Sequence, residues 1–117
     1  MGVVYHARLL DWFEQGRTEF LRRVGPSYKV LEAQGVFLPV VKADLAYRVP
    51  LRYDDEVEVE TRLVRLGAVT AEFRYLVRRV WDGASAAGGG TVHACVNARH
   101  RPTRFPLVLH QRLRNEV

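Results

Sequence analysis

Hydrophobic residues between Ala7 and Val24 recur at spacings of three, four and seven positions, which is typical of one face of an α-helix. Gly25 and Pro26 follow and predict the end of this helix. Gly16 lies inside it at a cost of about 1 kcal/mol relative to alanine, which indicates close approach of another backbone. The apolar face comprises Leu9, Phe13, Phe20 and Val24, with Leu10, Trp12 and Leu21 beside them.

A short second helix is predicted at 28–34, and the pattern then changes to the alternation of half-buried strands. Pro39 favours an edge position or a bulge for the first strand, because proline lacks an N–H donor. Asp82-Gly83 predicts a hairpin turn, and the three glycines at 88–90 are interpreted as a loose or bulged lead-in to the last strand. The predicted strands are 36–47, 56–64, 69–81 and 91–97, followed by a helix near 107–115.

One long helix followed by four antiparallel strands predicts an α+β protein in which a curved sheet wraps the helix. No linker or repeat divides the chain, so residues 1–117 are expected to form a single domain. No apolar run reaches the roughly 20 residues that a membrane helix needs. The single cysteine, Cys95, excludes an internal disulfide and is consistent with the cytoplasm.

The formal net charge of +5 would suit nucleic acid, a membrane surface or a phosphorylated small molecule. The arginines are dispersed, however, and only residues 99–104 form a local basic cluster. A nucleic-acid-binding domain would also need exposed aromatic residues beside its arginines. Phe13, Phe73 and Tyr75 fall on apolar faces instead, so a nucleic-acid partner is not expected.

The start of the long helix lacks an ordinary cap, since residues 3–8 contain no Ser, Thr, Asp or Asn. The free N–H groups of the first turn therefore meet water, another part of the chain or a ligand. Two interpretations stay open at this point: a hydrated helix end, or a site that stabilises a developing oxyanion.

The segment GVVYHARLLDWFE at 2–14, with RTEFL at 17–21, resembles the opening of 4-hydroxybenzoyl-CoA thioesterase-like proteins. The nearest group within that family is the acyl-CoA thioesterases associated with the Tol–Pal system. The resemblance covers most of the chain up to about Pro106. Its further parts are Leu38–Val41, Pro50, Tyr53–Val57 and Thr91–Val96.

This resemblance implies a hotdog fold, assembly into homodimers or homotetramers through the sheets, and active sites at subunit interfaces. The implied reaction is hydrolysis of a small acyl- or aroyl-CoA thioester, with no cofactor beyond the coenzyme A of the substrate. By position, the backbone N–H of His6 is the oxyanion donor. Tyr5 and the His6 side chain would line the site, and Gly2 belongs to the same motif.

The family motif reads Asp-x-x-Gly-Val-Val-x-His, which places the nucleophilic or general-base aspartate two positions before Met1. The strand that precedes it in the family is absent as well. The sequence is therefore expected to be N-terminally truncated, with impaired hydrolysis and an exposed sheet edge. The alternative is a non-catalytic module that binds acyl-CoA or an acyl carrier.

Substrate contacts are expected from two further groups of residues. Phe37, Pro39 and Val41 are candidate pocket walls. Arg99, Arg101 and Arg104 are candidates for the coenzyme A phosphates, because guanidinium groups suit phosphate oxygens; a solvated loop is the alternative.

Other polar residues are assigned structural roles. His93 and Cys95 have no third ligand nearby, so packing rather than metal binding is predicted for them. Asp11 would point away from the helix start, and Asp54 and Asp55 fall in a turn where aspartate commonly forms local hydrogen bonds.

Overall fold

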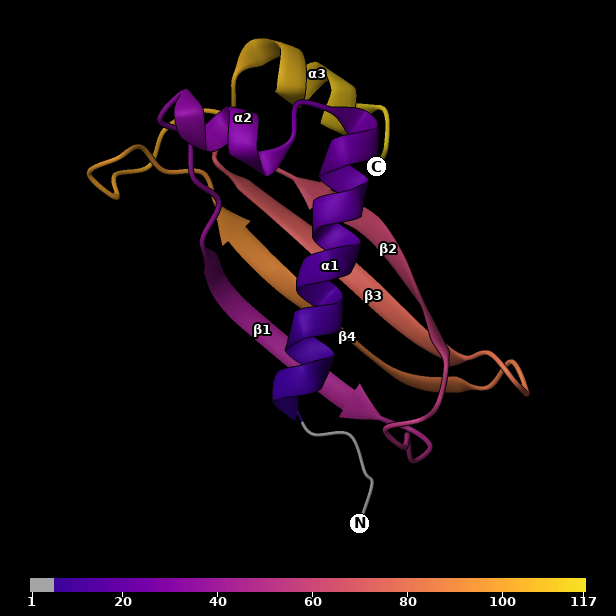
Figure 1. Cartoon of the computed structure of the whole chain (residues 1–117). Helices are drawn as coiled ribbons and strands as arrows, with labels where there is room; N and C mark the ends of the chain where they lie inside the picture. The colour runs from indigo at the N-terminus through magenta and orange to yellow at the C-terminus, as the bar shows by residue number, and fades with distance from the viewer. Residues whose placement is uncertain (1–5) are drawn as a thin grey trace.

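In a computed structural model, residues 6–117 are described, with the side chain of His6 excepted. A four-stranded antiparallel sheet has the order β1-β4-β3-β2, and the longest helix, α1, lies across one of its faces (Figure 1). The helices α2 and α3 lie over the end of the sheet opposite the start of α1. The elements are α1 (His6–Val24), α2 (Tyr28–Ala33), β1 (Val40–Tyr47), β2 (Val57–Leu66), β3 (Thr70–Arg79), β4 (Ser85–Ala94) and α3 (Leu107–Arg114).

The predicted apolar face of α1 is confirmed, because it packs on the sheet. The ring of Phe13 stacks on Tyr75 of β3 with centroids 4.3 Å apart, and Phe20 meets Phe73 edge-on at 5.4 Å. Aromatic pairs of this kind stabilise beyond the area that they bury. Gly25, with φ of +68°, ends the helix where the sequence predicts.

A strand does approach Gly16 closely, as predicted, but it does so through side chains and not through its backbone. A Cβ atom at this position would overlap Oγ1 of Thr61 and lie 3.1 Å from Cγ1 of Val59, both on β2. A glycine is needed there because α1 crosses β2 with no room for a side chain.

Strands β2 and β3 follow the predicted alternation. Thr61 of β2 pairs with Tyr75 of β3, and the inward residues of β3 are buried while most of their neighbours are not. The predicted hairpin turn is confirmed, since Gly83 has φ of +71° and its N–H donates to the carbonyl of Arg79 over 2.8 Å. The buried inward residues of β3 are Ala71, Phe73, Tyr75 and Val77.

Within residues 6–117, strand β1 pairs only with β4 and is an edge strand, as Pro39 predicts. The predicted start at residue 36 is wrong, because the ladder begins at Val40. Before it, Phe37 makes an isolated bridge to Val96. A register shift between Val40 and Lys42 interrupts the strand near its start.

The interpretation of residues 88–90 as a loose lead-in is wrong. These glycines lie inside β4, which begins at Ser85 and pairs with both β1 and β3. A Cβ at Gly89 would overlap the carbonyl oxygen of Asp44 and lie 3.0 Å from Cε2 of Phe13. The glycine is thus required by the packing of Phe13 and β1 against the middle of the sheet.

The C-terminal helix α3 occupies the predicted position and buries Leu109 and Leu113. Near the end of the chain, Glu116 forms an ion pair with Arg23 at the end of α1, at 2.7 Å. Within residues 6–117, no helix combines the length and apolar character needed to cross a membrane.

Candidate active site

The N-terminus of α1 provides the first part of the site. The helix begins at His6, and its first turn contains no acidic side chain. The N–H groups of that turn have no partner within the helix, and together with the helix dipole they favour a negative charge placed before them. Of the predicted catalytic residues, His6 therefore occupies the helix start by its backbone, whereas Tyr5 and Gly2 lie outside the described residues.

A buried chain of hydrogen bonds provides the second part. Nη1 of Arg17 donates to the hydroxyl of Tyr75 at 3.2 Å, and that hydroxyl lies 2.7 Å from Oγ1 of Thr91. Thr91 in turn lies 2.8 Å from Nε2 of His93, whose Nδ1 lies 2.8 Å from the carbonyl oxygen of Leu38. A carbonyl can only accept, so Nδ1 carries the proton and a neutral imidazole accepts from Thr91 at Nε2.

Burial sets the protonation states along this chain. The pKa of His93 is lowered to about 4, chiefly by burial; the bond to Leu38 opposes this shift and the charge of Arg17 adds to it. Burial also raises the pKa of Tyr28, which accepts a hydrogen bond from Nε of Arg17 at 2.7 Å. At neutral pH this series of hydrogen-bonded side chains therefore carries a single charge, that of Arg17.

Cys95 is not an activated thiol. It is fully buried, and burial raises its pKa to about 11, so the thiolate that would act as nucleophile or metal ligand is disfavoured. His93 is equally buried, and both of its ring nitrogens have partners within the protein. The two residues lie in the core, where packing was predicted for them.

A cavity of about 470 Å³ opens beside Arg17, between α1, α2 and the segment before β1. A smaller cavity of about 250 Å³ lies next to it along α1 and shares Glu14 and Arg17 with it. The larger cavity is lined by Glu14, Arg17, Thr18, Tyr28, Glu32, Phe37, Leu38, Pro39 and His100. The smaller one is lined by Leu10, Asp11, Phe13, Glu14, Arg17, Val40, Ala43 and Thr91. The two cavities are neighbours along the side of α1 that faces residues 37–43.

The predicted substrate residues fall into three places. Phe37 and Pro39 line the larger cavity. Val41 lies on β1, is 60% exposed, and belongs to the lining of neither cavity beside Arg17. Arg99, Arg101 and Arg104 are exposed in the loop after β4, at the end of the sheet where α2 and α3 lie (Figure 1). Within one chain, they are thus at the opposite end from the start of α1.

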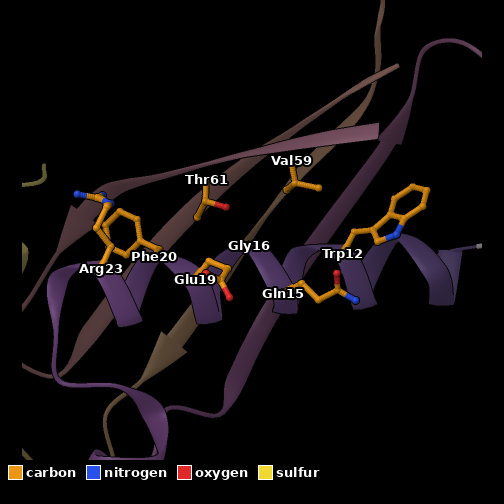
Figure 2. A pocket seen from close by; sticks show the side chains of 8 residues that line it. All are labelled: Trp12, Gln15, Gly16, Glu19, Phe20, Arg23, Val59 and Thr61. Atoms are coloured by element: carbon orange, nitrogen blue, oxygen red, sulfur yellow. The ribbon is translucent and has the colours of Figure 1, made fainter. Parts of the chain in front are cut away.

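A third hollow, also of about 470 Å³, lies on the other side of α1, against β2 (Figure 2). Trp12 lies at one end of it and Arg23 at the other, with Gly16 closest to the strand. The hydroxyl of Thr61 in this hollow is buried and has no hydrogen-bond partner among the described residues. The hollow does not include Arg17 or any residue of the buried polar chain.

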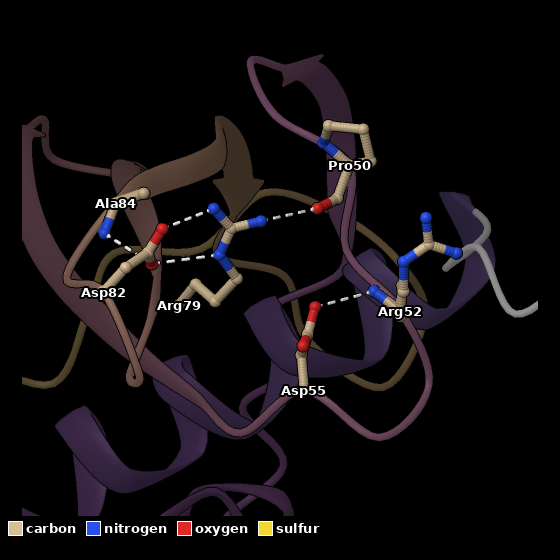
Figure 3. Close-up of polar contacts among 6 residues, drawn as sticks. All are labelled: Pro50, Arg52, Asp55, Arg79, Asp82 and Ala84. Carbon is tan, nitrogen blue, oxygen red and sulfur yellow. Dashed lines mark hydrogen bonds and ion pairs between the residues drawn. The ribbon is translucent and has the colours of Figure 1, made fainter.

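The end of the sheet near the start of α1 is held by a second polar group (Figure 3). Nε of Arg79 donates to Asp82 at 2.9 Å and Nη1 donates to the carbonyl of Pro50 at 3.1 Å; the bonds from Arg79 lower the pKa of Asp82 to about 2. Asp55 accepts from the backbone N–H of Arg52 at 2.8 Å. The local structural role predicted for Asp55 is therefore confirmed.

The sequence does contain a signal for the buried chain. Arg17 is four residues from Phe13, which is itself four residues from Leu9, so a cation occupies a position of the apolar face. Its side chain is only 8% exposed. A charged residue at an inward position indicates a buried polar partner or a ligand.

A single long helix laid on a curved antiparallel sheet defines a hotdog-fold protein of the thioesterase class. Residues 1–113 match the family profile of the Thioesterase-like superfamily. The chain belongs to this family.

Individual relatives agree with that membership. The chain is 43% identical over 106 residues to "Putative acyl-CoA thioesterase YneP" of Bacillus subtilis, covering 90% of this chain and 76% of that protein. It is 34% identical over 108 residues to the acyl-CoA thioesterase YbgC of Haemophilus influenzae, covering 90% and 77%. Among solved structures, the protein TT1821 from Thermus thermophilus has a TM-score of 0.92 at 39% identity, covering 100% of this chain and 88% of that one.

Proposed function

We propose that this protein hydrolyses acyl-CoA thioesters in the cytoplasm, as the Tol–Pal-associated type of 4-hydroxybenzoyl-CoA thioesterase-like proteins does. The observation that carries the proposal is the family match over residues 1–113, supported by relatives named as acyl-CoA thioesterases. Small acyl and aroyl groups are the proposed substrates. The 1,4-dihydroxy-2-naphthoyl-CoA hydrolase of Synechococcus elongatus, 29% identical over 108 residues, is a relative named for an aroyl substrate.

The start of α1 supplies the oxyanion site in this proposal. The backbone N–H of His6 donates to the thioester oxygen as the carbonyl carbon becomes tetrahedral, and the helix dipole stabilises the developing charge. The absence of acidic side chains from the first turn of α1 leaves this field uncancelled. By resemblance, the attacking group is an aspartate or a water that it activates, placed before Gly2 and outside these 117 residues.

The cavity beside Arg17 is too far from the helix start of the same chain to share a small acyl group with it. His6 and Arg17 are separated by about 16 Å along the axis of α1, at roughly 1.5 Å per residue. A second copy resolves this separation. We propose that β1 pairs antiparallel with β1 of a partner subunit, because it is an unpaired edge that exposes 46% of Val40 and 60% of Val41.

Twofold pairing places the start of one β1 beside the end of the other. The cavity lies at the start of β1, whereas α1 begins at the end of the sheet where β1 finishes (Figure 1). Each helix start therefore meets the cavity of the other copy. The proposed active site has an oxyanion hole from one subunit and an acyl pocket, with Phe37 and Pro39 in its wall, from its partner.

A non-catalytic acyl-CoA-binding module is the second candidate. It is favoured by the position of Asp11, the first acidic residue of α1, which is exposed in its second turn and not at the helix start. Such a module would keep the cavity and bind the thioester without cleaving it.

The test is a panel of acyl-CoA thioesters assayed for free thiol release, with this chain and with a form extended upstream of Met1. Hydrolysis by either form supports the thioesterase, and hydrolysis only by the extended form assigns the nucleophile to the upstream segment. Binding of acyl-CoA by both forms without hydrolysis would replace the enzyme with the binding module. Neither binding nor hydrolysis would contradict both candidates.

A further inference from the structure

Arg17 is a buried cation that has no ionic partner in the described part of the chain. Its side chain is 8% exposed, and its hydrogen bonds go to two neutral hydroxyls, those of Tyr28 and Tyr75. Within residues 7–117, the ion pairs formed at N···O distances up to 4.0 Å involve other arginines. A buried charge of this kind is costly unless something compensates it.

The guanidinium group also has hydrogen-bonding capacity to spare. It carries five N–H donors, of which one on Nε and one on Nη1 are used. The remaining donors, one on Nη1 and two on Nη2, point from adjacent nitrogens in the arrangement that holds both oxygens of a carboxylate.

Arg17 also borders the two cavities described above. Among the described residues, the only buried side-chain polar atom without a partner is Oγ1 of Thr61, so Nη2 of Arg17, which bonds to no described group, is not sealed in the core. Arg17 lines both the cavity of about 470 Å³ and the one of about 250 Å³. A ligand that enters either space meets the guanidinium group directly.

The rest of the larger cavity suits a short hydrocarbon chain. Phe37, Leu38 and Pro39 provide an apolar wall, and the hydroxyl of Tyr28 already bonds to Arg17. Glu14 and Glu32 line the same cavity but are exposed, so water screens their charges more than that of Arg17. The buried charge consequently dominates at the floor of the cavity.

We propose that Arg17 binds a carboxylate at the far end of the acyl group, so that the preferred substrates are ω-carboxyacyl thioesters. This inference rests on the proposed thioesterase function and on its two-subunit site. The thioester carbonyl lies at the helix start of one subunit, and the terminal carboxylate reaches Arg17 of the partner subunit. Plain acyl groups of the same length fill the cavity but leave the guanidinium group unpaired.

The experiment compares adipoyl-CoA with hexanoyl-CoA, which have the same chain length and differ in the terminal carboxylate. We expect kcat/KM to favour adipoyl-CoA by about tenfold or more, with most of the difference in KM, since a charge-assisted bond forms on binding. Arg17→Met should reduce the preference by about 10- to 100-fold, and Arg17→Lys, which keeps the charge without the fork, by less. Arg22→Met is the matched control: Arg22 is an exposed arginine of the same helix, paired with Glu19, and its loss should leave the preference unchanged.

The preference is the ratio of kcat/KM for adipoyl-CoA to that for hexanoyl-CoA on the same protein sample. Partial unfolding of a variant lowers both values equally and does not change the ratio. Equal kcat/KM for the two substrates in the wild-type protein, or an unchanged ratio in Arg17→Met, would overturn the role of Arg17 while the thioesterase stands. If no thioester is hydrolysed, the proposed function fails first. Titration with the uncleavable thioethers of the same two acyl groups then decides the carboxylate site independently, by tighter or equal binding of the carboxylated one.

Discussion

The imidazole of His93 donates its Nδ1 proton to the carbonyl oxygen of Leu38 over 2.8 Å, which links the end of β4 to the segment that precedes β1. Through Thr91 and Tyr75, the same imidazole is connected to Arg17 on α1. One chain of hydrogen bonds thus fixes the wall of the larger cavity, at Leu38, to its charged floor, at Arg17. The neutral state of His93 is needed for this, because only a neutral imidazole accepts from Thr91.

This arrangement predicts acid sensitivity of the fold. The pKa of His93 is lowered from 6.5 to about 4, so below pH 6.5 the unfolded chain takes up a proton that the folded chain resists. The free energy of unfolding should therefore fall as the pH drops from about 6.5 to about 4, by about 3 kcal/mol from this residue. Denaturant titrations at a series of pH values measure it.

The comparison protein for this measurement is His93→Gln, which should lose that part of the pH dependence whatever its stability at pH 7. His110→Gln serves as control, because His110 is only partly buried and bonds through Nε2 to the carbonyl of Gly67. Parallel pH profiles for the wild-type protein and His93→Gln would show that His93 does not titrate in this way.

Gly89→Ala should destabilise the protein by about 3 kcal/mol or more. The added methyl group overlaps the carbonyl oxygen of Asp44 and presses on Phe13, and neither the paired backbone of β1 nor the stacked ring can move freely. At Gly83 an added Cβ would have no atom within 4 Å, but the backbone φ is +71°. Gly83→Ala should therefore lower the free energy of unfolding by only about 1 kcal/mol, through backbone strain. Equal losses for the two variants in thermal unfolding would refute the packing account of Gly89.

Gly16 and Thr61 should be energetically coupled. Gly16→Ala gains helix propensity but drives its methyl group into Oγ1 of Thr61, so a net loss of about 1–2 kcal/mol is expected. Thr61→Ala removes a buried hydroxyl that has no partner in the described chain and should be close to neutral. In the double variant the overlap with Oγ1 of Thr61 is gone and only the close contact with Val59 remains. The coupling measured by a double-mutant cycle should therefore exceed about 1 kcal/mol; additive effects would mean that the two sites are independent.

The proposed pairing of β1 predicts a dimer whose stability depends on Val41. Val41→Asp places a carboxylate in the interface and should weaken dimerisation by about tenfold or more, as judged by sedimentation equilibrium. Val64→Asp is the control on β2, at the opposite edge of the sheet, where Val64 is 40% exposed. A wild-type protein that stays monomeric at micromolar concentration would remove the basis for a shared site, and a homotetramer would require a second interface.

Periodicity was sufficient to predict the long helix, its apolar face and the two strands β2 and β3, because these elements bury one face and expose the other. It failed at Gly88, Gly89 and Gly90. By strand propensity alone, three consecutive glycines predict an interruption of the strand. In β4, however, the close approach of α1 and β1 requires residues without side chains in the middle of the strand. That requirement comes from tertiary packing and has no local signal.

The candidate site divides in the same way. The helix start could be predicted, and Phe37 and Pro39 do border a cavity, because a missing cap and an apolar run before a strand are local features. The roles of these residues toward a substrate stay predictions. The buried hydrogen bonds from Arg17 to Leu38 join four segments that are distant in sequence. Only Arg17, a cation on an apolar helix face, could therefore be recognised from the sequence. The basic loop at 99–104 was visible in the sequence as a cluster of arginines. Its position in the structure was not, because a cluster in sequence does not indicate which end of the sheet it occupies.

The central claim is that each active site combines the helix start of one subunit with the cavity of the other, and mixed dimers test it most directly. His6→Pro removes the oxyanion donor but is tolerated in the first turn of a helix, and Thr18→Trp fills the cavity. Each variant alone should be inactive in the form of the protein that hydrolyses acyl-CoA. Co-refolded in equal amounts, they should regain about a quarter of wild-type activity, because half of the dimers then contain one intact site out of two. A mixture as inactive as its components would place both parts of the site in one chain and contradict the account.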